Sequence, residues 1–195
     1  MAVGFGFKIA KGQNAPQEIV TCVKLVGDSV LLGKGDAVKL VTGSINIGSG
    51  PTVQAVARAA SGDRVYGIVV GVDQLNIASA SFSLDRTHSP ASTAQYVYVR
   101  PVGSTGELYE VQEDAVGGSV ATTSVGNNIT MIVANASTTT GMSGTMADSS
   151  TAATTNTLDL CIRGFADRAD NVPGSTAILL VSFNKIAQVD QATGV

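Results

Sequence analysis

Charged and aromatic side chains are scarce in this chain of 195 residues. Asp, Glu, Lys and Arg make up 14% of it, aromatics make up 5%, and there is no tryptophan. An average soluble domain has about 25% charged residues. Twelve basic residues against 15 acidic ones leave a formal net charge of -3. The sequence therefore has no cationic footprint for nucleic acid, and its hydrophobic share of 44% is too high for a disordered chain.

Titratable residues of the kinds that carry catalysis or bind metals are also few. His88 is the one histidine, and Pro90 and polar neighbours place it in an expected loop. No Gly-x-Ser-x-Gly segment presents a serine to it, and the two cysteines, Cys22 and Cys161, lie too far apart in sequence to form a zinc motif with His88. We expect no enzyme activity, no cofactor and no metal.

Two other patterns resemble functional motifs without matching them. Residues 27–34 look like a phosphate-binding loop, but five residues separate the glycines where the motif has four, and Gly35 replaces the required Ser or Thr. The second pattern is a run of carboxylates: Glu107, Glu110, Glu113 and Asp114. Paired catalytic carboxylates cannot be assigned from it, because a solvated loop would cluster such residues equally well.

Long apolar runs are absent. No stretch approaches the 18 residues of a membrane-spanning helix, and the first residues lack the basic and apolar regions of a signal peptide. We expect synthesis in the cytoplasm, no membrane partner, and reduced core thiols at Cys22 and Cys161.

What the sequence does contain is a series of short Val-, Ile- and Leu-rich runs bounded by Gly, Asp, Asn, Ser or Pro. This punctuation is typical of β-strands. We expect strands in the ranges 18–26, 29–32, 37–41, 64–72, 80–84, 95–100, 108–112, 129–133, 158–163 and 177–183, with 51–58 either a strand or one helical turn. About ten short, mostly antiparallel strands predict an all-β fold, a sandwich or a barrel.

Two segments stand apart from this pattern. Residues 1–16 are glycine-rich and predict an extended N-terminal arm before a single β domain over 17–195. Phe5 and Phe7 lie on this arm; they either tuck onto their own domain or anchor, with Lys8, on a neighbouring molecule. Half of residues 135–156 are Ser or Thr, which predicts a long exposed loop.

The dipeptide Asp-Arg occurs three times and ends in Arg64, Arg86 and Arg168. Neighbours on a strand point to opposite faces, so each arginine is free to reach a carboxylate elsewhere. Arginine is favoured at subunit contacts. Together with Phe5, Phe7 and Lys8, these arginines are our candidate partner contacts.

An ordered series of short segments spans nearly the whole chain: Gly4-Phe-Gly-Phe-Lys8, Gly35-Asp-Ala-Val-Lys-Leu40, Pro51–Val53, Ala59–Gly71, Tyr96–Val99, Glu110–Gln112, Val125–Asn128, Leu160–Gly164, Asp170–Asn171 and the last apolar strand. In this order they resemble head decoration (cement) proteins of tailed bacteriophages. The resemblance implies a structural virion protein on the outer face of the head. It further implies the major capsid protein as partner and a homo-oligomer, dimer or trimer, that straddles capsid subunits. The long Ser/Thr-rich segment departs from the family pattern.

Other functions stay open at this point. A carbohydrate-binding or adhesion module of a virion would stack sugars on Tyr96 or Tyr109. A tail-tube subunit would share the all-β composition and would polymerise into rods. A small hydrolase would need His88.

Overall fold

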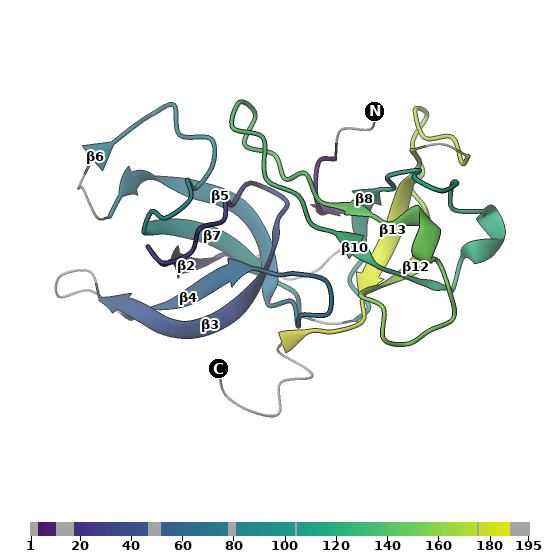
Figure 1. The fold of residues 1–195 in the computed structure, drawn as a ribbon, viewed down its shortest axis with the longest axis horizontal. Coiled ribbons are helices and arrows are strands. Elements are labelled where there is room, and N and C mark those ends of the chain that lie inside the picture. Colours follow the sequence, from purple (N-terminus) through teal and green to yellow (C-terminus); the bar gives the residue numbers. More distant parts are fainter. Residues whose placement is uncertain are drawn as a thin grey trace.

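The computed structural model describes residues 4–10, 18–46, 52–77, 81–103, 105–174 and 176–187. Within these ranges the regular structure consists of strands and two single-turn 3-10 helices, η1 (Thr122–Ser124) and η2 (Ser149–Thr151). The predicted all-β fold of short, mostly antiparallel strands is confirmed. Figure 1 shows two lobes side by side, one built on each main sheet.

The first lobe is a small barrel. Its strands are β2 (Val20–Lys24), β3 (Ala37–Asn46), β4 (Thr52–Arg58), β5 (Gly67–Asn76) and β7 (Gln95–Pro101). They lie in the order β3-β4-β2-β7-β5, and a further pairing of β3 with β5 closes the ring. All of these pairs are antiparallel except β2 with β4. The short strand β6 (Ser81–Phe82) extends the β5 edge.

The second lobe is a five-stranded sheet in the order β1-β8-β13-β12-β9. Its strands are β1 (Lys8–Ile9), β8 (Tyr109–Gln112), β9 (Asn128–Ile129), β12 (Leu160–Phe165) and β13 (Ile178–Phe183). A separate antiparallel pair, β10 (Met131–Ile132) and β11 (Met146–Ala147), lies beside it.

Side chains that alternate along the barrel strands divide between two hydrophobic clusters. Val38 and Val69 belong to the cluster inside the barrel, whereas the adjacent Ala37 and Ile68 belong to a larger cluster with Leu179 and other residues of the second sheet. Since successive residues of a strand face opposite sides, one strand can serve both cores. This explains why residues 64–72 carry apolar side chains almost without interruption, as expected of a strand buried on both faces.

The predicted strand ranges agree with the structure except at a few points. Residues 52–58 form a strand and not a helical turn. The expected strand at 29–32 is reduced to an isolated bridge between Leu32 and Ser89. β1 and β11 were not predicted, because each is two residues long and has no period of its own.

The described part of the predicted arm, residues 4–10, is built into the domain. β1 pairs with β8, and Phe7 is only 3% exposed in the core shared by the two lobes. The ring of Phe7 packs against Phe183 with centroids 4.8 Å apart. Of the two alternatives for this side chain, the structure has the one in which Phe7 tucks onto its own domain. Its burial argues against a direct contact with a partner.

Residues 135–156 are not one exposed loop, so that prediction is wrong. β11 lies within them, and Ser143, Thr145 and Ser149 are buried. The hydroxyls of these side chains are hydrogen-bonded inside the protein. The Ser/Thr content, which suggested a solvated loop, instead supplies the short donors that a tightly folded segment needs.

A buried carboxylate, Asp36, joins three parts of the chain. Its Oδ2 accepts a hydrogen bond from the Gly33 backbone at 2.8 Å, and its Oδ1 accepts one from the Ser143 hydroxyl at 2.5 Å. One residue earlier, the carbonyl of Gly35 accepts a hydrogen bond from the amide of Phe7 at 2.8 Å. The N-terminal segment, the 33–36 turn and the 143–145 segment therefore meet at one place, which we call the Asp36 junction.

Glycines allow the backbones at this junction to approach each other. A Cβ added at Gly33 would meet the Gly141 carbonyl oxygen and the Ala136 side chain at separations that real Cβ atoms do not show. Gly6 has a φ of 72°, and a Cβ added there would lie equally close to the Gly35 carbonyl oxygen and the Ser143 side chain. Larger residues at these points would push the three segments apart.

We predict that Gly33→Ala destabilises the protein by about 1–3 kcal/mol, the usual cost of overfilling a packed site. The control is Gly27→Ala, because nothing lies within 4 Å of a Cβ added at Gly27 and its φ is not positive. Chemical denaturation of both variants measures the difference. Equal stabilities would contradict the close approach at Gly33.

Asp36 also predicts a pH dependence. Burial raises the pKa of Asp36 above its ordinary value of 3.8, while hydrogen bonds from Ser143 and Gly33 act in the opposite direction. A raised folded-state pKa means that the stabilising contribution is complete below pH 3.8 and is lost as the pH rises through the folded pKa.

We therefore expect the unfolding free energy of the wild type, relative to that of Asp36→Asn, to fall as the pH rises from 3.8 through the folded-state pKa of Asp36. Urea denaturation of both proteins at several pH values measures it. The exposed Asp167→Asn removes the same charge at the surface and serves as control. A difference between wild type and Asp36→Asn that stays constant with pH would contradict the prediction.

Candidate functional site

The predicted contact residues do not form a single site. Phe5 is half-buried at the Asp36 junction, and Arg64 is exposed on the barrel. Lys8 and Arg168, which are far apart in sequence, both reach the carboxylate of Glu110, at 3.7 and 3.5 Å. Arg168 also pairs with Asp170 at 2.9 Å. The Glu110 carboxylate is buried, whereas the side chains of Lys8 and Arg168 are 63% and 35% exposed, so both cations are accessible from the surface.

The carboxylate run at 107–114 is not a solvated loop. Glu107, Glu110 and Glu113 are all buried. Glu113 accepts hydrogen bonds from the backbone amides of Val120 and Ala177, at 2.6 and 3.0 Å. Glu107 accepts one from the Tyr109 hydroxyl at 2.7 Å. These carboxylates tie loops to the second sheet, since buried charge is retained where it is hydrogen-bonded.

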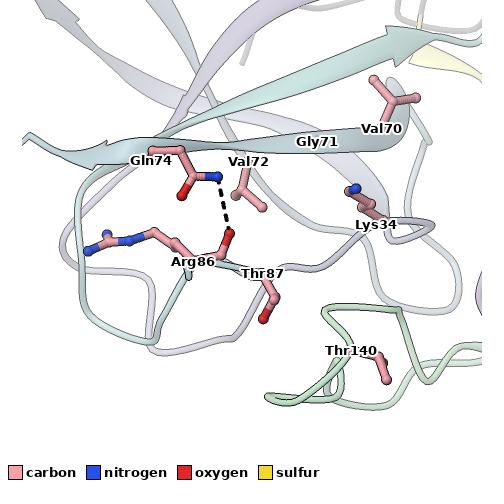
Figure 2. A pocket seen from close by; sticks show the side chains of 8 residues that line it. All are labelled: Lys34, Val70, Gly71, Val72, Gln74, Arg86, Thr87 and Thr140. Carbon is pink, nitrogen blue, oxygen red and sulfur yellow. Dashed lines mark hydrogen bonds between the residues drawn. The ribbon is translucent and has the colours of Figure 1, made fainter. Parts of the chain in front are cut away.

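A polar pocket lies on the barrel beside strand β5. It has a volume of about 240 Å³ and is lined by Lys34, Val70, Gly71, Val72, Gln74, Arg86, Thr87 and Thr140. Figure 2 shows β5 along one side of the pocket, with the residue 86–87 segment and the loop that carries Thr140 across from it. Arg86, one of the predicted contact residues, thus lines this pocket.

The lining of this pocket is positively charged. It includes the cations of Lys34 and Arg86 and contains no Asp or Glu. Within the described part of the chain, Nη1 of Arg86 and Oε1 of Gln74 are buried without a hydrogen-bond partner. Burial, and secondly the charge of Arg86, lowers the pKa of the neighbouring His88. Sequence analysis rejected the 27–34 segment as a phosphate loop, and the structure has no helix there, yet Lys34 is brought to a pocket by tertiary folding.

Among the described residues, four of the eight exposed large apolar side chains form two groups, and the others are Ile19, Val26, Val125 and Met142. At one end Phe82 and Leu84 are 65% and 81% exposed. Val116 and Val172 are 67% and 71% exposed on two loops that a hydrogen bond from Ser119 to the Gly174 carbonyl holds together. In Figure 1, β6 and the loop before β13 lie toward opposite ends of the long axis. These two groups, which we call the apolar ends, were not predicted.

The side chains suggested for other functions are buried or half-buried. Tyr96 and Tyr109 are buried, so neither ring is presented to a sugar. His88 is half-buried, with Nδ1 3.2 Å from the Thr87 hydroxyl, and Ser89 beside it is fully buried. In the ranges that the structure covers, no three His, Cys, Asp or Glu side chains come together as a metal site would need. Nor do these ranges hold a helix of the length and hydrophobicity that spans a membrane.

Comparison with known proteins adds no relative. No family model matches the chain, and neither the curated proteins nor the solved structures include a match to it.

Both cysteines are free and buried, as expected of reduced core thiols. Burial raises the pKa of Cys22 to about 11. Since the thiolate is the reactive form, we predict that Cys22 resists alkylation in the folded protein at pH 8 and reacts on unfolding. A Cys161→Ser variant isolates this thiol, and labelling in denaturant provides the control. Rapid labelling of the folded variant would contradict the prediction.

Proposed function

We propose that this protein is a structural component of a phage virion, which binds the outer surface of the icosahedral head and reinforces the capsid. The observation that carries the proposal is the pair of apolar ends on a small, charge-poor β protein. A protein with apolar contacts at both ends of its long axis is suited to bridge two neighbours. The neighbours would be subunits of the major capsid protein or further copies of this chain in a dimer or trimer.

The energetics of such bridging are favourable even for small contacts. Complete burial of one Val, Leu or Phe side chain contributes about 1.5–3 kcal/mol. Leu84 lies in the turn after β6, two residues beyond Phe82, so both side chains are close enough along the chain to reach one partner surface. On a symmetric shell each contact is repeated at every equivalent position, and linked contacts bind more tightly than separate ones.

The resemblance to cement proteins supports the same proposal. Two of its motifs, the Gly-Phe-Gly-Phe segment and the Gly35-Asp36 turn, touch each other in the structure through the hydrogen bond from Phe7 to Gly35. Because the two motifs are in direct contact, we expect them to occur together as one structural unit. Deleting residues 1–16 is a poor test of attachment, because it also removes the buried ring of Phe7 from the core.

The test is co-sedimentation of the purified protein with undecorated, expanded phage heads at rising protein concentration. We expect saturable binding at a fixed ratio to capsid subunits. Phe82→Ser with Leu84→Ser should weaken it about tenfold or more, because two buried apolar contacts are lost. Ile19→Ser is the matched control, since Ile19 is 56% exposed just before the start of β2, whereas the other end of β2 is the one in register with the β5–β6 end of the barrel.

If the folded wild-type protein does not bind the heads, the proposal is overturned. If the Phe82→Ser, Leu84→Ser variant binds as tightly as the wild type, that apolar end takes no part in the contact. Electron microscopy of the same sample examines the tail-tube alternative, because a tube subunit would form hollow rods. A glycan array tests the adhesion alternative, because an adhesion module would bind one or more of the glycans.

A further inference from the structure

Two buried polar atoms of residues that line the pocket beside β5, Nη1 of Arg86 and Oε1 of Gln74, have no hydrogen-bond partner in the described chain. In the described part of the chain, Arg86 and Lys34 form no ion pair with a carboxylate, and Nη1 of Arg86 has no acceptor although it is buried. A buried donor on a charged group without a partner costs about 1–3 kcal/mol or more. A bound ion or an ordered water is a usual partner for such a group.

The groups around the two cations point to the chemistry of that acceptor. The hydroxyl of Thr140 and the amide of Gln74 complete the polar lining, whereas the Thr87 hydroxyl already donates to the Thr138 carbonyl, and every other lining side chain is uncharged. Guanidinium and ammonium groups with hydroxyls favour carboxylate or phosphate oxygens, which accept several short charge-assisted hydrogen bonds. A neutral or cationic ligand would leave both charges uncompensated.

The walls of the pocket are held in place by the backbone. The amide of Lys34 donates to the Gly141 carbonyl, and the carbonyl of Lys34 accepts from Ser143, both at 2.8 Å. The Thr87 hydroxyl donates to the Thr138 carbonyl at 3.2 Å. The two loops are thus tied to each other and to the Asp36 junction. A site whose walls are already ordered loses little entropy when a ligand binds.

We propose that this pocket binds an anionic ligand with carboxylate or phosphate oxygens that meet Arg86 and Lys34. Figure 2 shows the two cations at opposite ends of the lining, with β5 residues between them. This arrangement favours a ligand with more than one anionic group over a single small ion. The pocket has a volume of about 240 Å³. The inference does not depend on the proposed function.

Binding is measured by calorimetry with three probes: inorganic phosphate, citrate, and a short peptide with two glutamates, whose glutamine counterpart is the control. An ionic strength of about 0.01 M keeps screening weak. We expect at least one anionic probe to bind and the glutamine peptide not to bind. Lys34→Gln and Arg86→Gln should each weaken binding about tenfold, since each loses a charge-assisted hydrogen bond. Arg64→Gln, which removes an equal charge from the exposed surface, should bind as the wild type does.

The probes distinguish the two sources of the anion. Preference for the glutamate peptide over citrate and phosphate assigns the pocket to an acidic protein segment, and the reverse assigns it to a free anion. Lys34 is exposed, so Lys34→Gln tests the pocket without disturbing the core around Arg86. Failure of all three probes to bind the wild type, or equal affinity in all three variants, would overturn the proposal. Neither result bears on capsid binding through the apolar ends.

Discussion

The buried carboxylate of Asp36 is the constraint on which the rest of this structure depends. It accepts a hydrogen bond from Ser143, which lies 107 residues further along the chain, and another from the turn in which it lies. A buried charge is tolerated only with such partners, so the 143–145 segment must fold back onto the barrel. The N-terminal segment then follows, because Phe7 bonds to Gly35 and its ring enters the core between the lobes.

The polar pocket is a consequence of the same constraint. Lys34 lies two residues before Asp36, and the loop that carries Thr140 is brought across from β5 by the close approach of Gly33 to Gly141. The apolar ends, in contrast, lie away from the junction on β6 and on the loop before β13. The fold thus separates a rigid centre, which holds a cationic pocket, from two extremities whose apolar side chains have no partner within the described chain.

Sequence analysis located most strands but few of the contacts. The strands at 95–100 and 177–183 were predictable because a short run of apolar residues between turn residues is a purely local pattern. The burial of Glu107 and Glu113 was not predicted, since nothing in their own neighbourhood shows that the amides of Val120 and Ala177 come to meet Glu113. Of the residues that line the pocket, Arg86 was predicted as a partner contact but not as part of a pocket. Lys34 was rejected together with the phosphate-loop motif at 27–34.

By itself, the sequence determined the all-β class and the positions of the main strands, because both depend on local pattern and composition. Tertiary structure alone decided that Phe7 is a core residue, that the Ser/Thr-rich segment is folded in, and that Lys34 and Arg86 share a pocket. These outcomes depend on contacts between residues far apart in the chain. The free energy of burying a ring or a charge is set by those distant partners, which no local pattern encodes.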